Sequence, residues 1–306
     1  MQTKQGLTSK TEKDWHTRIR KFLELINKRN APKTGEELIK DLARDMGDIE
    51  PDQKKRYLNG WCEILNYGIE RHSMSKRWTP PDAKIIKELR GTSTRTRKQK
   101  LTPYVEEHDL FKLLDHLEGS DPSMFLATGL ISIFGLRLAE LAALKVVDGK
   151  LYVGHVKNNI NTSDIERDSR RAFAMDLIQM PNLGEKLINL YDSGLVKLPA
   201  TIRTQINLVE KKNRYGDVGR AFVDKLEKNH IWKEIRKNNS DITAYSLRHR
   251  FAHQCHKGST IPISIKDAAE AMGHTVDVHM KSYGSYTTEL SVERAFDLHK
   301  KSRVEA

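Results

Sequence analysis

An arginine, a histidine and a tyrosine follow one another near the C-terminal end of this 306-residue chain. Arg248 lies in Y-S-L-R-H-R-F-A-H, and His274 and Tyr283 lie in A-M-G-H-T-V-D-V-H-M-K-S-Y. A tyrosine hydroxyl can attack a phosphodiester, and the N–H groups of arginine and histidine can neutralise the charge that develops on the phosphate oxygens. The segment therefore predicts a centre for phosphoryl transfer to a tyrosine.

A second arginine, Arg137, lies far upstream in the apolar stretch I-S-I-F-G-L-R-L-A-E-L. An arginine there must be paired or must face a cleft, because burying an unpaired charge costs several kcal/mol. Glu140 can hold its guanidinium and leave the free edge for a ligand. Together with Arg248 it could then grip one phosphate bidentately, which a lysine does poorly. The alternative for Arg137 and Glu140 is an ion pair on the surface of a helix.

Composition predicts a soluble, folded chain that is 38% hydrophobic and 31% charged. No run approaches the roughly 18 apolar residues of a membrane span, and the two cysteines, Cys62 and Cys255, are typical of a reducing compartment. We expect a cytoplasmic protein. Residues 1–100 hold 24 Lys or Arg against 14 Asp or Glu, within a formal net charge of +12 for the whole chain. This excess is expected if the N-terminal third lies on a polyanion, and a solubilising surface is the alternative.

The elements that must position these residues fall into two predicted domains. Residues 1–89 show helical spacing from Asp14 to Lys28, a capping box that starts at Thr34, and a third helix over residues 52–69. Residues 90–100 read R-G-T-S-T-R-T-R-K-Q-K, which has nothing to bury and predicts a basic linker.

Residues 101–306 are predicted to be mainly α with a small antiparallel β-sheet. A capped helix follows Leu101, and an apolar helical run extends from Met124 to Leu144. K-L-Y-V-G-H-V-K-N-N then predicts a strand that enters a turn, and R-R-A-F-A-M-D-L predicts the return strand. The chain looks helical again from about Asn182 onward.

From Leu101 to its end, the chain resembles the tyrosine recombinase (phage integrase) family. The resemblance rests on an ordered set: G-L-R-L-A-E-L, a hairpin lysine, L-R-H-R-F-A, G-H, and a tyrosine nine positions after that histidine. It implies the recombinase catalytic fold, preceded by a helical core-binding domain that matches the N-terminal unit. It also implies that the two domains close around duplex DNA as a C-shaped clamp, and that four protomers act together on DNA.

By this resemblance, Tyr283 attacks the scissile phosphate and forms a 3′-phosphotyrosyl bond. Arg137, Arg248 and His274 stabilise the charge, and Lys157 in the hairpin protonates the leaving 5′-oxygen. The bond energy is kept in the protein–DNA link, so neither ATP nor a metal is required and no cofactor is expected. Two residues compete for these roles. They are Tyr286 as nucleophile and His155 in proton transfer.

One position departs from the family. Tyr245 stands three residues before Arg248, where most of the family has histidine. A phenol with an ordinary pKa near 10 is a poor general base at neutral pH, although it can donate a hydrogen bond to phosphate. Proton removal from Tyr283 is therefore open between His249, an altered Tyr245 and water.

A metal site is the competing interpretation of the histidines. His249 and His253 share a helix face, and Cys255 and His256 follow just beyond. Against it stand the absence of H-E-x-x-H and of C-x-x-C.

The resemblance implies a site-specific recombinase or integrase that acts on double-stranded DNA as a homotetramer, with an accessory protein possible for direction. A rival hypothesis, favoured by Tyr245, is a DNA-binding protein that keeps the fold without catalysis. A third is a related tyrosine transesterase, such as a type IB topoisomerase or a telomere resolvase.

Overall fold

The computed structural model describes residues 9–92, 103–156, 169–212, 214–257 and 263–284, together with residues 293, 296, 297 and 301. The chain divides into two compact units, Met1–Thr96 and Arg97–Ala306. Each unit has its own cluster of buried apolar side chains. None of the described helices is long and apolar enough to cross a membrane.

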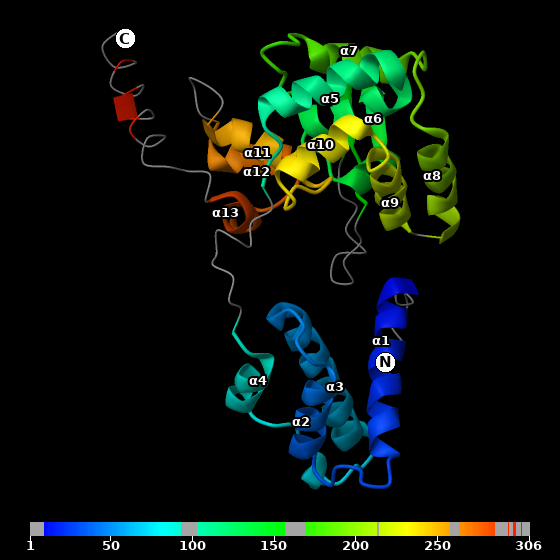
Figure 1. Cartoon of the computed structure of the whole chain (residues 1–306), viewed down its shortest axis with the longest axis vertical. Helices are drawn as coiled ribbons and strands as arrows, with labels where there is room; N and C mark the ends of the chain where they lie inside the picture. The colour runs from blue at the N-terminus through cyan, green and yellow to red at the C-terminus, as the bar shows by residue number, and fades with distance from the viewer. Residues whose placement is uncertain are drawn as a thin grey trace. The chain divides into compact units, whose positions relative to one another are not determined.

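The described part of the N-terminal unit is helical (Figure 1). Its elements are α1 (Ser9–Ile26), α2 (Gly35–Asp45), α3 (Pro51–Arg71), the 3-10 helix η1 (Lys76–Trp78) and α4 (Ala83–Arg90). The core of this unit consists of apolar side chains from all of these elements except α4, namely Phe22, Leu38, Ile39, Leu42, Ala43, Leu58, Trp61, Leu65 and Trp78.

The start of α2 follows the predicted capping box with one difference. Thr34 is the N-cap, and its hydroxyl accepts a hydrogen bond of 3.2 Å from the backbone N–H of Glu37. The Glu37 carboxylate reaches back to the N–H of Lys33, at 2.8 Å, rather than to that of Thr34. The N–H of Glu37, which the first turn leaves open, and the N–H of Lys33 before the helix each gain an acceptor in this way.

The end of this unit differs from the prediction. A further helix, α4, follows the prolines at residues 80 and 81, because Asp82 caps it by accepting a hydrogen bond from the N–H of Ile85. The predicted linker therefore starts within α4 at Arg90, and residues 93–102 lie outside the described part of the chain.

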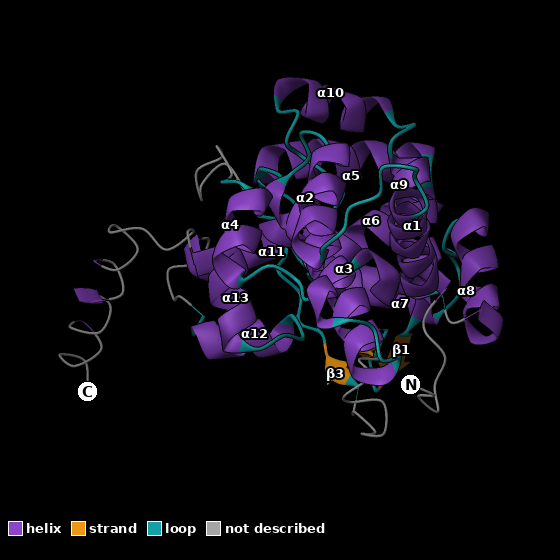
Figure 2. Ribbon diagram, turned by 90° about the horizontal axis from the view of Figure 1, so that it is seen from below, coloured by secondary structure: helices purple, strands orange, loops and turns teal. Residues whose placement is uncertain are grey.

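The second unit contains nine of the described helices, one further 3-10 helix and one sheet (Figure 2). Its first six elements are α5 (Glu107–Ser120), α6 (Pro122–Ile133), η3 (Leu138–Ala142), β1 (Leu144–Val147), β2 (Lys150–Val153) and β3 (Arg170–Arg171). The remaining helices are α7 (Leu183–Asp192), α8 (Ala200–Lys212), α9 (Tyr215–Leu226), α10 (His230–Asn238), α11 (Ser246–Lys257), α12 (Ile265–Ala271) and α13 (Val276–Tyr283). The predicted class, mainly α with a small antiparallel sheet, is confirmed.

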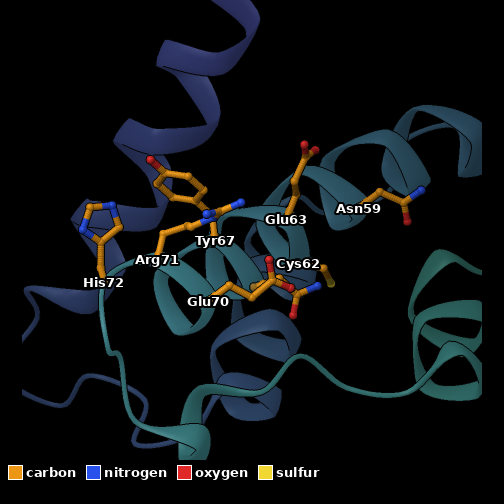
Figure 3. Close-up of a pocket in the computed structure, with 8 residues that line it drawn as sticks. Asn59, Cys62, Glu63, Tyr67, Glu70, Arg71 and His72 are labelled. Carbon is orange, nitrogen blue, oxygen red and sulfur yellow. The ribbon is translucent and has the colours of Figure 1, made fainter. Parts of the chain in front are cut away.

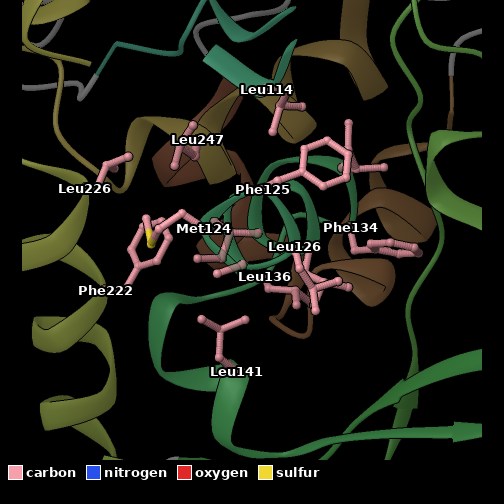
Figure 4. Packing of buried hydrophobic residues seen from close by; sticks show 14 of the residues in the cluster. Leu114, Met124, Phe125, Leu126, Phe134, Leu136, Leu141, Phe222, Leu226 and Leu247 are labelled. Carbon is pink, nitrogen blue, oxygen red and sulfur yellow. The ribbon is translucent and has the colours of Figure 1, made fainter. Parts of the chain in front are cut away.

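Helix α6 forms the centre of this unit. All its residues from Met124 to Ile133 are buried, as expected for a helix that is apolar on every side. It contacts α5, α7 and α11. Figure 4 shows Phe125 and Leu126 of α6 among apolar side chains from other elements, including Phe222 and Leu247.

The predicted helical run from Met124 to Leu144 is wrong beyond Ile133. Gly135 has a φ of +60°, which ends α6, and the chain continues as η3 and then as strand β1. A Cβ atom at Gly135 would lie 2.6 Å from Cγ of Phe251, so the close approach of α11 also requires glycine here. This break places Arg137 at the N-cap of η3 instead of inside a helix.

The sheet is antiparallel in the order β1-β2-β3. Asp148 and Gly149, both with positive φ, form the two-residue connection between β1 and β2. The predicted return strand is shorter than expected: only Arg170 and Arg171 pair, with Val153 opposite Arg170. Along the chain, η3 is followed by β1 and then by β2. Pairing of β3 with β2 therefore places the Arg170 side chain beside Glu140 of η3.

Candidate active site

A buried carboxylate, that of Glu140, organises the charged centre of the second unit. The Glu140 residue is 2% exposed. One of its oxygens accepts a hydrogen bond of 2.7 Å from Nη1 of Arg137, and the other accepts one of 2.7 Å from the Arg137 backbone N–H. The predicted pairing of Arg137 with Glu140 is thus present, in a 3-10 helix. Nη2 of Arg137 also donates to the carbonyl of Gly273, at 2.8 Å.

Arg170 is a second arginine on Glu140, and it is not among the predicted site residues. Its Nη2 donates a hydrogen bond of 2.8 Å to the Glu140 carboxylate, and its Nη1 donates one of 2.8 Å to the carbonyl of Ala271. Burial lowers the pKa of Arg170 to about 10, and the attraction of Glu140 opposes that shift. Arg170 is therefore still a cation at neutral pH.

Arg248, near the start of α11, is fully buried. Its guanidinium donates to the carbonyl of Gly135, and to the carbonyl of Met272 at 2.7 Å. One of its nitrogens lies 3.7 Å from the Glu140 carboxylate. The Nε–H of Arg248 is buried and has no hydrogen-bond partner among the described residues. A buried donor without an acceptor is costly, so the site can gain an acceptor from a ligand.

The site carries an excess of positive charge. Three guanidinium groups, those of Arg137, Arg170 and Arg248, lie on the single carboxylate of Glu140. The net charge of this cluster is therefore +2. A buried excess of this kind is stabilised by an anion, and three arginines offer the planar donor sets that suit phosphate oxygens.

Tyr283, the last residue of α13, is 3% exposed and lies against this cluster. Burial raises the pKa of Tyr283 above its usual value of 10.0, while the charge of Arg248 and a hydrogen bond from it oppose the rise. Its ring stacks on that of His274, with centroids 5.7 Å apart and planes at 25°. Arg137, Arg248, His274 and Tyr283 are therefore close together, as the site hypothesis requires.

His274 begins a line of three hydrogen-bonded imidazoles, which we call the histidine chain. Nδ1 of His274 lies 3.3 Å from Nη2 of Arg248, and its Nε2 lies 2.8 Å from Nδ1 of His279. Nε2 of His279 lies 2.8 Å from Nε2 of His256, on α11. Burial, with Arg248 as a further cause, lowers the pKa of His274 to about 3. Burial likewise lowers the pKa of His279, to about 4, and that of His256, so all three are neutral at pH 7.

The two candidates for a general base lie next to Tyr283 in different environments. His249 is 7% exposed, and its ring centroid is 5.0 Å from that of Tyr283. Burial and the neighbouring Arg248 lower the pKa of His249 to about 4. Tyr245 is 38% exposed, and its ring lies 5.5 Å from that of His249. Tyr245 thus lies at the rim of the site and not in its centre.

Two residues of the hypothesis lie outside the described part of the chain. They are Lys157, the predicted general acid, and Tyr286, the rival nucleophile. His155, the alternative to Lys157, is described and is exposed just after β2.

The histidines of the metal hypothesis are not arranged as a cluster. His253 stacks on Tyr104, with centroids 3.7 Å apart, whereas His256 points to His279. Cys255 is buried, which raises the pKa of its thiol to about 12. Among the described residues, no group of three or more His, Cys, Asp or Glu is placed to hold a metal ion.

A separate pocket opens on α3 of the N-terminal unit, with a volume of about 860 Å³ (Figure 3). The residues that line it include Glu63 and Glu70, which carry carboxylates, and Arg71. None of the residues predicted to carry chemistry lies in this pocket. Its two carboxylates do not suit an anionic ligand, so the arginine cluster remains the candidate site.

No protein family model matches the chain, and no curated protein matches its sequence. Solved structures do match it. The chain is similar to XerH site-specific recombinase bound to its palindromic difH substrate in a post-cleavage complex, with a TM-score of 0.56 and 15% identity over 94% of this chain and 79% of that one. It is also similar to lambda integrase bound to DNA, with a TM-score of 0.54 and 17% identity over 90% of this chain and 88% of that one. A lambda integrase dimer bound to a COC′ core site gives a TM-score of 0.52 and 17% identity over 93% and 90%.

At these identities the likeness establishes the fold. The chain has the tyrosine recombinase fold, and the predicted resemblance is confirmed at that level.

Proposed function

We propose that the chain is a site-specific DNA recombinase of the tyrosine type, which cuts and rejoins duplex DNA through a 3′-phosphotyrosyl link to Tyr283. The observation that carries the proposal is the position of Tyr283 against Arg248, in a cluster with two uncompensated positive charges. The fold supports it, because structures with this fold include recombinases bound to DNA.

The charge of the cluster fits the transition state better than the ground state. A phosphodiester carries one negative charge, and attack by a tyrosinate produces a pentacovalent phosphorus with two. The cluster carries two net positive charges, because Glu140 neutralises one of its three arginines. This charge matches the two negative charges of the pentacovalent phosphorus. An enzyme accelerates a step by stabilising charge that appears only in the transition state, so this balance favours catalysis over simple binding.

The proposed sequence of bonds is a direct exchange. Oη of Tyr283 forms a bond to phosphorus as the bond from phosphorus to the 5′-oxygen breaks, with Lys157 as the proposed donor of the proton to that oxygen. The two arginines Arg137 and Arg248 donate hydrogen bonds to the non-bridging oxygens, and His274 lies beside the ring of Tyr283. The bond that breaks and the bond that forms are both phosphate ester bonds. The phosphotyrosyl link therefore stores the energy for rejoining, and the reaction needs no cofactor.

Access to phosphate requires a change at Tyr283. The side chain is buried on Arg248, which is itself fully buried. Arg248 can therefore meet the DNA backbone only after the Tyr283 side chain shifts off its guanidinium. We propose that DNA binding drives this exposure, because a phosphate can then supply the acceptor that Nε of Arg248 lacks.

Double-stranded DNA is the proposed partner of both units. The basic excess of residues 1–100 would lower the free energy of binding through release of counterions from the phosphates. Exchange of strands between two duplexes requires four active sites, so we propose a homotetramer on DNA. Solved structures with this fold include a lambda integrase dimer on a core site.

A second candidate function is DNA binding without catalysis. Two observations favour it: Tyr245 in the place of the family's usual histidine, and the burial of Tyr283. On this reading the arginine cluster binds phosphate but completes no exchange.

Trapping of a covalent adduct distinguishes these functions. A pool of duplexes with randomised sequence is first enriched for binding to the full chain, and then nicked so that a cleaved end diffuses away. The wild type and Tyr215→Phe, a tyrosine at the start of α9, should yield a protein–DNA adduct under denaturing conditions, and Tyr283→Phe should yield none. Binding without any adduct from the wild type would establish the second candidate. An adduct that persists in Tyr283→Phe would show that another residue is the nucleophile.

A further inference from the structure

The histidine chain has a fixed direction, which Arg248 imposes. A guanidinium donates hydrogen bonds and accepts none, so Nδ1 of His274 must be the acceptor at 3.3 Å. Neutral His274 then carries its proton on Nε2 and donates to Nδ1 of His279. His279 must carry its own proton on Nε2 and donate to Nε2 of His256. The tautomers of all three imidazoles follow from this one contact.

The histidine chain also joins two different environments. His279, the middle member, is fully buried, whereas His274 and His256 are each partly exposed. His274 lies beside Tyr283 at the arginine cluster. His256 lies on α11, near its end at Lys257. Each neutral imidazole can take a proton on one nitrogen while it releases one from the other, so such a line can conduct a proton through a buried region.

We infer that His279 and His256 relay the proton of the Tyr283 hydroxyl from His274 to solvent during DNA cleavage. The inference rests on the proposed function and answers the question that Tyr245 raises, namely which group removes this proton. His274 takes the proton, and the two further histidines act through it.

The proposed step balances. Arg248 turns to the phosphate and releases Nδ1 of His274, which then accepts the proton from Oη of Tyr283 as the bond from Oη to phosphorus forms. The proton on Nε2 of His274 moves to Nδ1 of His279, and the proton on Nε2 of His279 moves to Nε2 of His256. The proton on Nδ1 of His256 passes to water. One proton enters the line and one leaves it, while the 5′-oxygen takes its proton from a separate donor.

Rejoining restores the line without rotation of any ring. When the 5′-hydroxyl attacks the phosphotyrosyl bond, Tyr283 leaves as a phenolate that needs a proton. His274 now carries one on Nδ1 and returns it, and the other two histidines shift their protons back in the reverse order. Cleavage and rejoining are opposite reactions, so a device that reverses with them suits both.

The electrostatics of the site explain why a relay is favourable. A proton that stayed on His274 would add a positive charge beside Arg248, in a cluster that already has an excess of positive charge. The same repulsion, after burial, is among the causes that keep the pKa of His274 low. Transfer to His256 moves the charge away from the arginines to a partly exposed position.

His249 is the competing base, since it also lies against Tyr283. It differs in one testable respect: on a substrate with sulfur in place of the 5′-oxygen, which leaves without a proton, a base that acts alone moves a single proton, whereas the histidine chain moves several in one step. The rate of adduct formation by the wild type on this substrate, in mixtures of H₂O and D₂O, should therefore fall along a curve. A straight line would overturn the relay, and this measurement needs no variant.

Two substitutions of the buried middle member separate relay from positioning. In His279→Gln, an amide can still donate and accept hydrogen bonds toward His274 and His256, but it cannot pass a proton on readily. His279→Phe removes both functions. We expect both variants to form the adduct about 10²-fold more slowly than the wild type in a single turnover near neutral pH, with the rate rising about tenfold per pH unit as hydroxide takes over. His230→Gln is the matched control, because His230 lies on α10 and is not part of the histidine chain. This variant should form the adduct at the rate of the wild type.

The outcomes distinguish the relay from the proposed function. If the wild type forms the adduct and His279→Gln forms it at the same rate, the relay is wrong and recombinase chemistry stands. If His279→Phe alone is slow, His279 only positions His274. If the wild type forms no adduct on DNA that it binds, the proposed function itself fails.

Discussion

Arg170 donates a hydrogen bond of 2.8 Å to the buried carboxylate of Glu140, which also holds Arg137. The contact joins strand β3 to η3 and brings a third cation to the cluster. Arg170 has little exposed surface of its own, at 15% for the side chain. It therefore contributes mainly by its charge and by the way it holds Glu140 and the carbonyl of Ala271.

Replacement of Arg170 should slow catalysis more than it weakens DNA binding. Arg170→Gln removes one of the two uncompensated positive charges, so the transition state loses more stabilisation than the ground state. We expect the rate of adduct formation to fall by about 10- to 100-fold, comparable to the loss of one charge-stabilising donor. Arg171→Gln is the matched control, because Arg171 is exposed and stacks on Phe173. Equal rates in the two variants would remove Arg170 from the site.

Glu140→Gln tests the centre of the cluster through stability. The substitution keeps the shape of the side chain but leaves three guanidinium groups near each other without their counter-charge. Loss of one partner from a buried ion pair costs about 3 to 5 kcal/mol, and we expect the free energy of unfolding of the second unit to fall by that amount. Glu118→Gln, which breaks an exposed pair with Lys186, should cost under about 1 kcal/mol. Urea unfolding at low ionic strength measures both.

Local rules were sufficient for the parts of the fold that depend on neighbours in sequence. The cap at Thr34 and the pairing of Arg137 with Glu140 each involve residues three positions apart, and both are present. The dipeptide Asp148–Gly149 was an unused signal of the same kind, because it favours the turn between β1 and β2. Its recognition would have ended the predicted helix before Leu144.

The rest of the site depends on contacts that spacing along the chain does not encode. Arg170 reaches Glu140 only because β3 pairs with β2, and the predicted return strand gave no reason to select its first residue. His279 joins His256 across two helices, α13 and α11. A histidine five positions after another matches neither a helical face nor a known motif, so the histidine chain could not be recognised without coordinates.

Gly135→Ala should destabilise the second unit through two separate effects. The residue has a φ of +60°, which an L side chain adopts at a cost of roughly 1 to 2 kcal/mol. A Cβ atom would also lie 2.6 Å from Cγ of Phe251. A shift of residue 135 away from this contact would disturb its own carbonyl, which binds Arg248. Gly149→Ala is the control, since Gly149 has a φ of +67° and no atom within 4 Å of an added Cβ. We expect a larger loss of unfolding free energy for Gly135→Ala; equal losses would show that α11 yields without cost.

Acid should destabilise the second unit through its buried neutral histidines. The pKa of His279 is about 4 in the folded protein against 6.5 as its ordinary value, mainly because of burial. Between these values the unfolded chain binds more protons than the folded one, so the free energy of unfolding falls as the pH falls from 6.5 towards 4. At pH 5 the loss from this one group is at most about 2 kcal/mol. His279→Gln lacks the group, so its unfolding free energy should fall less than that of the wild type between about pH 7.5 and pH 5, whereas His230→Gln should follow the wild type. Urea unfolding at the two pH values measures this difference, and identical losses in the wild type and His279→Gln would show that His279 is not held neutral in the folded state.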